Sequence, residues 1–271
     1  MTPIQTPSQV FDAVQSAKAG APAFCTNFFP VESKLRGWID HGELFAELRN
    51  GATFFFRKDR DFLRLYFCAA DVAALQREMV ARPCVQTERV ITDLVGKGPA
   101  LDDLASAIES AGFRRHTLLQ RFVRAAGPES AADGPPVGFA EKADSQAVLR
   151  LIESLFDHYG EQLPTLYEIE SAVASRQILA ARSNGELAGV LFFETQGLAS
   201  TIRFWAVAET FRDLKTGSAL MRQYLKIHDA VRRFTLWVNA NNENAIRKYR
   251  HFGYAPDGLI DRVLARGLIP T

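Results

Sequence analysis

The second half of this 271-residue chain shows the most regular spacing of apolar and polar residues. Residues 137–140 are typical of a short strand. From Asp144 to His158, apolar residues recur at positions 148, 149, 151, 152, 155 and 156, which is the pattern of an amphipathic helix. A second, shorter helix is expected within Tyr159–Ala174, after a Gly-Glu-Gln-Leu-Pro turn at residues 160–164. This half therefore begins with one strand and two helices.

A β-hairpin is predicted after these helices. Residues 177–181 and 187–195 are apolar runs, and Asn184-Gly185 between them supplies the positive φ angles of a tight turn. Residues 201–207 and 234–238 are further strand candidates, and each is followed by a predicted helix. Strand, two helices, hairpin, strand, helix, strand, helix and strand predict an α/β (α+β) fold with a mixed central sheet flanked by helices.

The segment from Phe211 to Met221 has the features of a phosphate-binding loop. Apolar residues at positions 220, 221, 224 and 225 predict a helix that begins near Thr216 or Gly217. A loop that runs into a helix N-terminus binds pyrophosphate well, because its amides point at the anion and the helix dipole favours negative charge.

A short capped helix is predicted after the strand at 234–238. Asn242 can accept a hydrogen bond from a free N–H of the first turn. Gly253 suits the left-handed residue that ends such a helix. Tyr249 lies between them, so its phenol is carried by a helix that is fixed at both ends.

These two segments, about thirty residues apart, together resemble the acetyl-CoA site of the GNAT superfamily of acyl-CoA N-acyltransferases. The phosphate loop of that family has the form Arg/Gln-x-x-Gly-x-Gly/Ala. Arg212 and Gly217 match its outer positions, and Lys215 stands where the middle glycine usually lies. A side chain at that position either crowds the phosphate or adds an ammonium contact that compensates for the missing glycine.

The resemblance implies an N-acetyltransferase that moves an acetyl group from acetyl-CoA (coenzyme A) to a primary amine, by direct attack in a ternary complex. Tyr249 is implied as the acid that protonates the departing thiolate, since a phenol with a pKa near 10 keeps its proton at neutral pH. A backbone N–H in the strand around Trp205 is implied as the donor to the oxyanion. The residues implied in binding the cofactor are Ala206, Val207, Arg212, Asp213, Leu214, Lys215, Thr216, Gly217, Ser218, Asn242 and Tyr249.

The general base is the least defined part of the expected site. Glu209 is the candidate catalytic base, acting through water beside the phosphate loop, and a solvated loop carboxylate is its alternative. Glu194 at the end of the hairpin, and His158 and Glu161 between the first two helices, are further groups near the expected acceptor pocket. Trp205 is expected either in the wall of that pocket or in the core.

The first half of the chain resembles a degenerate copy of the same domain. Residues 52–56 and 62–68 predict a hairpin, 84–95 a strand, 101–111 a helix and 115–124 a returning strand. This half has no Arg-x-x-Gly-x-Gly loop, so we expect that it lacks a cofactor site; an unrelated α+β domain is the alternative. The Gly- and Pro-rich segment 126–136 is the expected linker between domains at 1–125 and 137–271.

Composition limits the other functions. The 47% hydrophobic and 23% charged residues suit a globular chain, and a net charge of +1 gives no reason to expect nucleic acid. No apolar run is long enough to cross a membrane, and the N-terminus lacks the pattern of a signal peptide. The three cysteines (Cys25, Cys68 and Cys84) lack metal-ligand spacing and are expected to be free thiols in the cytoplasm.

The expected partner is a small-molecule amine or a protein or peptide amine, with a homodimer left open. A non-catalytic or regulatory member that binds coenzyme A weakly or not at all is the main alternative, because Lys215 interrupts the loop. A member that uses another acyl donor, or transfers to a hydroxyl, is the third.

Overall fold

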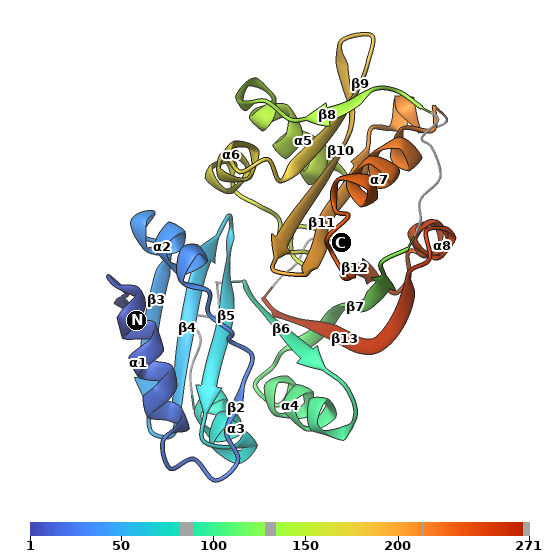
Figure 1. Ribbon diagram of the computed structural model, residues 1–271. Helices are drawn as coiled ribbons and strands as arrows, with labels where there is room; N and C mark the ends of the chain where they lie inside the picture. Colours follow the sequence, from blue (N-terminus) through green and yellow to red (C-terminus); the bar gives the residue numbers. More distant parts are fainter. Residues whose placement is uncertain (82–88, 128–133, 213, 268–271) are drawn as a thin grey trace. The chain divides into compact units, whose positions relative to one another are not determined.

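The computed structural model describes residues 1–81, 89–127, 134–212 and 214–267, which form two compact units (Figure 1). The first unit contains Met1–Leu119 together with the chain from Gly258 onward, and the second contains Gln120–Asp257. Cys84, Asp213 and most of the predicted linker lie outside the described residues. Within the described part of the chain, no helix is long and apolar enough to span a membrane.

The first unit has helices on a mixed sheet with the strand order β1-β3-β4-β5-β6-β13, and β2 pairs with β5. Its helices are α1 (Pro7–Lys18), α2 (Glu32–Asp40), α3 (Val72–Val80) and α4 (Pro99–Glu109). Its strands are β1 (Thr2–Pro3), β2 (Cys25–Thr26), β3 (Leu44–Arg49), β4 (Ala52–Asp59), β5 (Phe62–Ala69), β6 (Val90–Gly96), the start of β7 (Arg114–Ala125), and β13 (Ala255–Arg266) from Gly258 onward.

The second unit has the strand order β7-β12-β11-β10-β9-β8. Its helices are α5 (Ser145–Leu155), α6 (Leu166–Ala174), α7 (Thr216–Ile227) and α8 (Glu243–His251), with short 3₁₀ turns η1 (Lys142–Asp144) and η2 (Glu209–Phe211). Its strands are the end of β7, and β8 (Val137–Phe139), β9 (Ile178–Ser183), β10 (Glu186–Gln196), β11 (Ala199–Val207) and β12 (Arg233–Asn239). Helices α7 and α8 pack on one face of this sheet, and α5 and α6 pack on the other.

A β-bulge at Arg203 changes which residues of β11 face each core. Phe192 of β10 pairs with Phe204 and Phe193 pairs with Ile202, so Arg203 has no partner in this register. One extra residue reverses the alternation of side chains along a strand. Ile202 and Trp205 therefore both pack on the α7 and α8 side, whereas Phe204 packs on the α5 and α6 side.

The two parallel strands of the second unit pair over only part of their length. Residues 199–202 of β11 pair with residues 233–236 of β12, and the register ends there although both strands continue. The end of the pairing coincides with the bulge at Arg203. The carboxyl ends of β11 and β12 are therefore splayed.

The compact units do not coincide with the sequence segments 1–125 and 137–271. Strand β13 follows α8 in sequence, but its residues from Ile260 to Arg266 pair with β6 of the first unit. Conversely, β7 follows α4, and its residues from Gln120 onward belong to the second unit. The boundary in the sequence was placed from the Gly- and Pro-rich composition of the linker. Pairing between strands that are remote in sequence leaves no such local signal, so the units that β7 and β13 join were not predicted.

The second helix, expected within Tyr159–Ala174, begins after the predicted turn at residues 160–164. Helix α6 begins at Leu166, after an irregular segment that contains Pro164. Thr165 caps this helix and exchanges hydrogen bonds with Glu168 in a capping box. A proline disfavours helical geometry in the residue before it, which explains the start after this turn.

The first unit buries ionisable side chains on the neighbouring strands β5, β6 and β13. Arg64 is fully buried and donates a hydrogen bond of 2.6 Å to the carboxylate of Asp93. Asp261 is also buried, and burial raises its pKa well above the usual value; the charge of Asp93 raises it further, against the opposing effect of Arg64. Asp261 therefore keeps its proton to a higher pH than an ordinary aspartate does.

We expect Asp261→Asn to stabilise the protein increasingly as pH rises. The pKa of Asp261 is higher in the folded than in the unfolded chain, so unfolding gains from ionising this carboxyl once pH exceeds about 4. An amide has no proton to lose. The melting temperature of the variant should exceed that of the parent by a few degrees at pH 8, with a smaller difference at pH 4. Asp12→Asn, on the exposed side of α1, is the matched control. An equal shift at both pH values would contradict the buried neutral carboxyl.

Candidate active site

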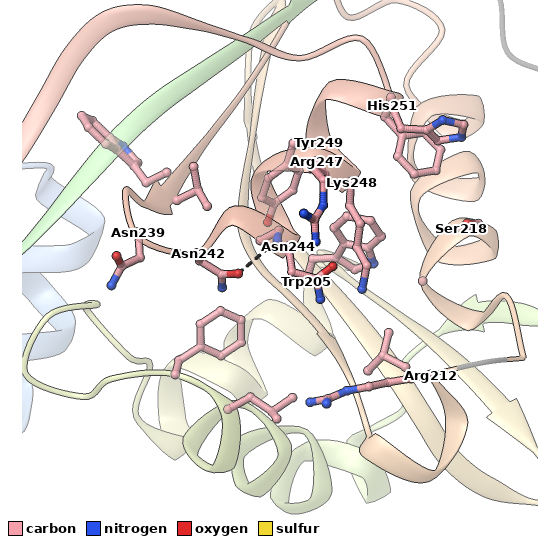
Figure 2. A pocket seen from close by; sticks show the side chains of 18 of the residues that line it. Trp205, Arg212, Ser218, Asn239, Asn242, Asn244, Arg247, Lys248, Tyr249 and His251 are labelled. Atoms are coloured by element: carbon pink, nitrogen blue, oxygen red, sulfur yellow. Dashed lines mark hydrogen bonds between the residues drawn. The ribbon is translucent and has the colours of Figure 1, made fainter.

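A cavity of about 790 Å³ opens at the splay between β11 and β12 (Figure 2). All residues that line it belong to the second unit. They come from five places in the fold: the end of α5 with the segment after it, the end of β11, the loop before α7 with the first turn of that helix, the end of β12, and α8 with the residues that flank it. The cavity therefore lies at the carboxyl ends of two parallel strands, where open α/β sheets bind ligands.

The backbone of β11 presents free hydrogen-bonding groups to this cavity. The N–H of Ala208 donates to the carbonyl of Ala188 in β10, at 3.0 Å. Hydrogen-bonded and non-hydrogen-bonded pairs alternate along an antiparallel ladder. The backbone N–H and C=O of Ala206 therefore point toward β10. Those of Trp205 and Val207 point toward the opposite edge of β11, where β12 no longer pairs with it.

The N-terminus of α7 forms a second wall. Lys215 is the N-cap and has a left-handed backbone, with φ of 58° and ψ of 13°. A Cβ atom at Gly217 would come within 3.1 Å of the Trp205 ring, which is tighter than ordinary contact. Any other residue at this position would require the indole or the first turn of α7 to move by a few tenths of an ångström. Glycine is also the residue that left-handed geometry favours at position 215.

Helix α8 holds Tyr249 at the cavity as the sequence predicts. The side chain of Asn242 accepts a hydrogen bond of 3.0 Å from the N–H of Ala245, and Gly253 follows the helix with φ of 77°. The Tyr249 ring lies 5.5 Å from that of Trp205, centroid to centroid. In the described residues no hydrogen bond occupies the Tyr249 hydroxyl, which leaves it available to a ligand.

Burial gives Tyr249 a strongly held proton. Its side chain is 7% exposed. Burial raises the pKa of its phenol above the usual value, and the charge of Glu161 raises it further. The phenol is therefore present as an acid throughout the neutral range.

Charges of opposite sign come from different elements of the cavity. Its carboxylates, Asp157 and Glu161, both lie between α5 and α6. Arg212 reaches the cavity from the loop before α7, and Arg247 and Lys248 come from α8 (Figure 2). Lys215 and His251 also line it on these two elements. An anionic ligand is therefore favoured beside α7 and α8, and a cationic one beside the α5–α6 segment.

Most of the predicted cofactor-binding residues meet at this cavity. Those that line it are Val207, Arg212, Lys215, Gly217, Ser218, Asn242 and Tyr249. Ala206 instead packs under α5 and α6, and the Thr216 hydroxyl donates to the carbonyl of Phe211, at 3.1 Å. Leu214 is exposed and does not line the cavity, and Asp213 is outside the described residues.

Glu209, the predicted base, lies at the surface. Its side chain is 86% exposed, pairs with Arg212 at 3.4 Å, and does not line the cavity. Glu194 pairs with Arg203 at 2.7 Å, and His158 packs against the ring of Tyr159. Glu161 is a cavity carboxylate with a perturbed pKa: burial raises its pKa to about 7, partly opposed by a backbone hydrogen bond.

Sequence reasoning did not select Asp157, Arg247 or Lys248, although all three line the cavity. For the two basic residues a signal exists in the sequence, because they directly precede Tyr249 on the same short helix. The role of Asp157 depends on an irregular segment that the sequence predicted as helix.

The equivalent place in the first unit is closed. Strands β5 and β6 also pair in parallel over a short stretch, Leu63–Arg64 with Val90–Ile91. The Asn27 amide bridges them where they separate: it donates to the Thr92 hydroxyl at 2.9 Å and to the carbonyl of Asp93 at 3.0 Å, and it accepts from the N–H of Phe67 at 2.7 Å. A side chain of the protein thus occupies the splay.

The first unit also lacks a phosphate loop at this place. Only residues 70–71 separate β5 from α3, whereas residues 208–215 separate β11 from α7. The carboxylate of Asp71 accepts the hydrogen bond from the N–H of Ala74 at 2.7 Å. A negative charge therefore occupies the helix N-terminus that a phosphate would need.

Comparison with known proteins agrees with the resemblance that the sequence of the second unit shows. The model of the acetyltransferase (GNAT) family matches residues 146–254. No curated protein matches the chain. Among solved structures, the chain is similar to a GCN5-related N-acetyltransferase from Sphaerobacter thermophilus, with 17% identity, a TM-score of 0.61, and coverage of 97% of this chain and 91% of that one.

Two further structures resemble the chain over nearly its whole length. A tandem GNAT protein from the clavulanic acid biosynthesis pathway has 15% identity and a TM-score of 0.61, with coverage of 100% of this chain and 98% of that one. A GCN5-related N-acetyltransferase from Kribbella flavida has 14% identity and a TM-score of 0.58, with coverage of 94% and 95%. These likenesses confirm the mixed α/β fold over nearly the whole chain, and the full-length match to a tandem GNAT protein agrees with two GNAT-like halves.

The family match and the cavity occupy the same part of the chain. The matched residues, 146–254, run from α5 to just beyond α8, and every residue that lines the cavity lies within them. This part of the chain therefore belongs to the GNAT family of acyl-CoA-dependent N-acetyltransferases.

Proposed function

We propose that the protein transfers an acetyl group from acetyl-CoA to a primary amine, by direct attack in a ternary complex at the cavity of the second unit. The observation that carries the proposal is the meeting of three features at one cavity: splayed strands, a helix N-terminus and a buried phenol. When bound, acetyl-CoA supplies the activated acetyl group as a thioester.

The residues present fit the two ends of such a donor. The amides of Gly217 and Ser218, in the first turn of α7, suit a pyrophosphate, and the cations of Arg212 and Lys215 add to this attraction. The freed peptide groups of Trp205 and Val207 suit the amide-rich arm and the carbonyl oxygen of the thioester.

Tyr249 is the proposed general acid. A thiolate that leaves a thioester needs a proton, and the hydroxyl of Tyr249 lines the cavity without a partner among the described residues. The raised pKa of this phenol keeps the proton in place at neutral pH. The low exposure of the side chain also shields the transfer from water.

The alternative of a non-catalytic member rests on Lys215. A non-glycine residue at this left-handed position shows that the loop departs from the usual family form. A non-catalytic member would fail to bind coenzyme A, or would bind it and not transfer an acetyl group. Measurements of coenzyme A binding and of turnover, on the parent and on its Tyr249 variants, therefore distinguish the two functions.

We expect Gly217→Pro to weaken acetyl-CoA binding more than Arg212→Ala does. Proline removes an amide of the first turn and places ring atoms toward Trp205, whereas Arg212 is half-exposed and its contact is screened by water. Loss of a hydrogen bond to a charged group predicts a decrease of about tenfold or more in calorimetric affinity. Circular dichroism verifies the fold. Equal affinities of Gly217→Pro and the parent would refute the phosphate site.

Lys215→Gly tests what the unusual cap does. Glycine relieves a left-handed conformation that costs a side-chain-bearing residue about 1–2 kcal/mol, so the melting temperature should rise or stay level. If the ammonium meets a phosphate, the affinity for coenzyme A falls or stays level and depends less on salt. A clear gain in affinity would show instead that the side chain obstructs the loop.

Tyr249→Phe should decrease kcat about a hundredfold or more and leave acetyl-CoA affinity nearly unchanged. The substitution removes the proton donor and keeps the ring that packs on Trp205. Steady-state kinetics with an accepted amine, together with calorimetry, measure both quantities. Full activity would leave this tyrosine only a packing role, and a fall in melting temperature without a fall in kcat would point the same way.

A further inference from the structure

Glu161 occupies a defined place in the cavity wall. It lies in the segment between α5 and α6, where its N–H donates to the carbonyl of Asp157 at 2.8 Å. The side chain lines the same cavity as Tyr249 and interacts with it electrostatically, because the charge of Glu161 raises the pKa of the phenol. The carboxylate and the phenol therefore line one cavity, close enough for the charge of the first to act on the second.

The segment that carries Glu161 is held firmly on both sides. The guanidinium of Arg203, at the β-bulge of β11, donates to the carbonyl of Gln162 at 3.2 Å and to Glu194 at 2.7 Å. Leu163 is 1% exposed in the core beneath α5 and α6. Before Glu161, the Phe156 ring packs edge-on against Phe204, at 5.1 Å between centroids. The backbone around the carboxylate is thus fixed by the strand that borders the cavity.

The environments of Glu161 and Tyr249 separate their proton affinities. Burial is the main cause that raises the pKa of Glu161 to about 7, so this group can both accept and release a proton near neutral pH. Tyr249 remains protonated in the same range. One group suited to take a proton and one suited to give it are what an acid–base pair requires.

We propose that Glu161 is the general base that deprotonates the acceptor, and that the acceptor is a primary amine that arrives as an ammonium ion. This inference rests on the proposed function. The ammonium enters on the side of Asp157 and Glu161, away from the cations on α8 and before α7 that suit the phosphates of the donor.

The protons balance as follows in the proposed reaction. The nitrogen of the ammonium gives one proton to Glu161, and its lone pair then forms a bond to the acetyl carbon while the carbon–sulfur bond breaks. The sulfur takes the proton of Tyr249, and the second proton lost by the nitrogen replaces it. Glu161 returns its proton to solvent. An ammonium ion and a thioester thus become an amide, a thiol and one free proton.

The pH dependence of Glu161→Gln tests this role. In the parent, kcat/KM for an alkylamine from a panel of small primary amines should rise with pH through an apparent pKa near 7. In Glu161→Gln, kcat/KM should fall about a hundredfold or more and lose this step. Glu170→Gln, on the exposed side of α6, is the matched control and should keep both rate and step.

Two comparisons make this test specific. An arylamine is neutral at pH 7 and needs no base before attack, so Glu161→Gln should slow it much less than an alkylamine. Glu209→Gln should behave like Glu170→Gln, because Glu209 is outside the cavity. Retention of the step in Glu161→Gln, or its loss in Glu209→Gln, would overturn the assignment of the base.

Two further measurements separate failure of this inference from failure of the proposed function. Calorimetry should show that Glu161→Gln binds acetyl-CoA as the parent does; a parent that binds acetyl-CoA but acetylates no amine would contradict the function itself. Carbon-13 NMR of protein labelled in its glutamates reads the base without turnover. One carboxyl should titrate near pH 7 and be missing in Glu161→Gln, and ordinary acidic titration of every glutamate would overturn the inference.

Discussion

The separation of β11 from β12 after a few paired residues is the constraint on which the rest of the second unit depends. Pairing stops at Ile202 and Leu236, next to the bulge at Arg203. The bulge also reverses the alternation of β11, which turns Trp205 toward α7 and α8. A cavity, a row of free peptide groups and an aromatic wall all result from one additional residue in one strand.

The bulge residue links the geometry of the strands to the chemistry of the cavity. Because Arg203 binds the carbonyl of Gln162, the strand that opens the splay also holds the segment with Glu161. Burial raises the pKa of both Glu161 and Tyr249, with a different consequence for each. It raises the pKa of Glu161 into the neutral range and keeps Tyr249 protonated, so base and acid coexist at one pH. The first unit shows the contrasting outcome, because Asn27 fills its splay and Asp71 caps its helix.

The sequence predicted those features that depend on neighbouring residues. Asn242, Tyr249 and Gly253 define α8 by capping and spacing alone, and Gly217 follows from helix periodicity, so these agree with the structure. Features that depend on remote partners were not accessible. The place of β13 depends on a partner about 170 residues earlier in the chain, and the altered pKa of Glu161 comes from burial that no local pattern records.

The base shows this limit most clearly. Glu209 lies beside the phosphate loop in sequence, which made it the expected base, yet its side chain is in solvent. Glu161 is about ninety residues before Tyr249, and only the fold brings the two together. The backbone of Lys215 is a similar case, since its left-handed φ follows from how α7 begins and not from its own preference.

Hydrogen–deuterium exchange of the full chain with and without acetyl-CoA tests most directly that the donor lies in the splay of the second unit. The account predicts slower exchange on binding at Trp205–Val207, at the first turn of α7 and along α8. It predicts unchanged exchange at the end of β5 and the start of α3, where Asn27 and Asp71 occupy the equivalent place. Protection in the first unit, or none at the end of β11, would contradict it.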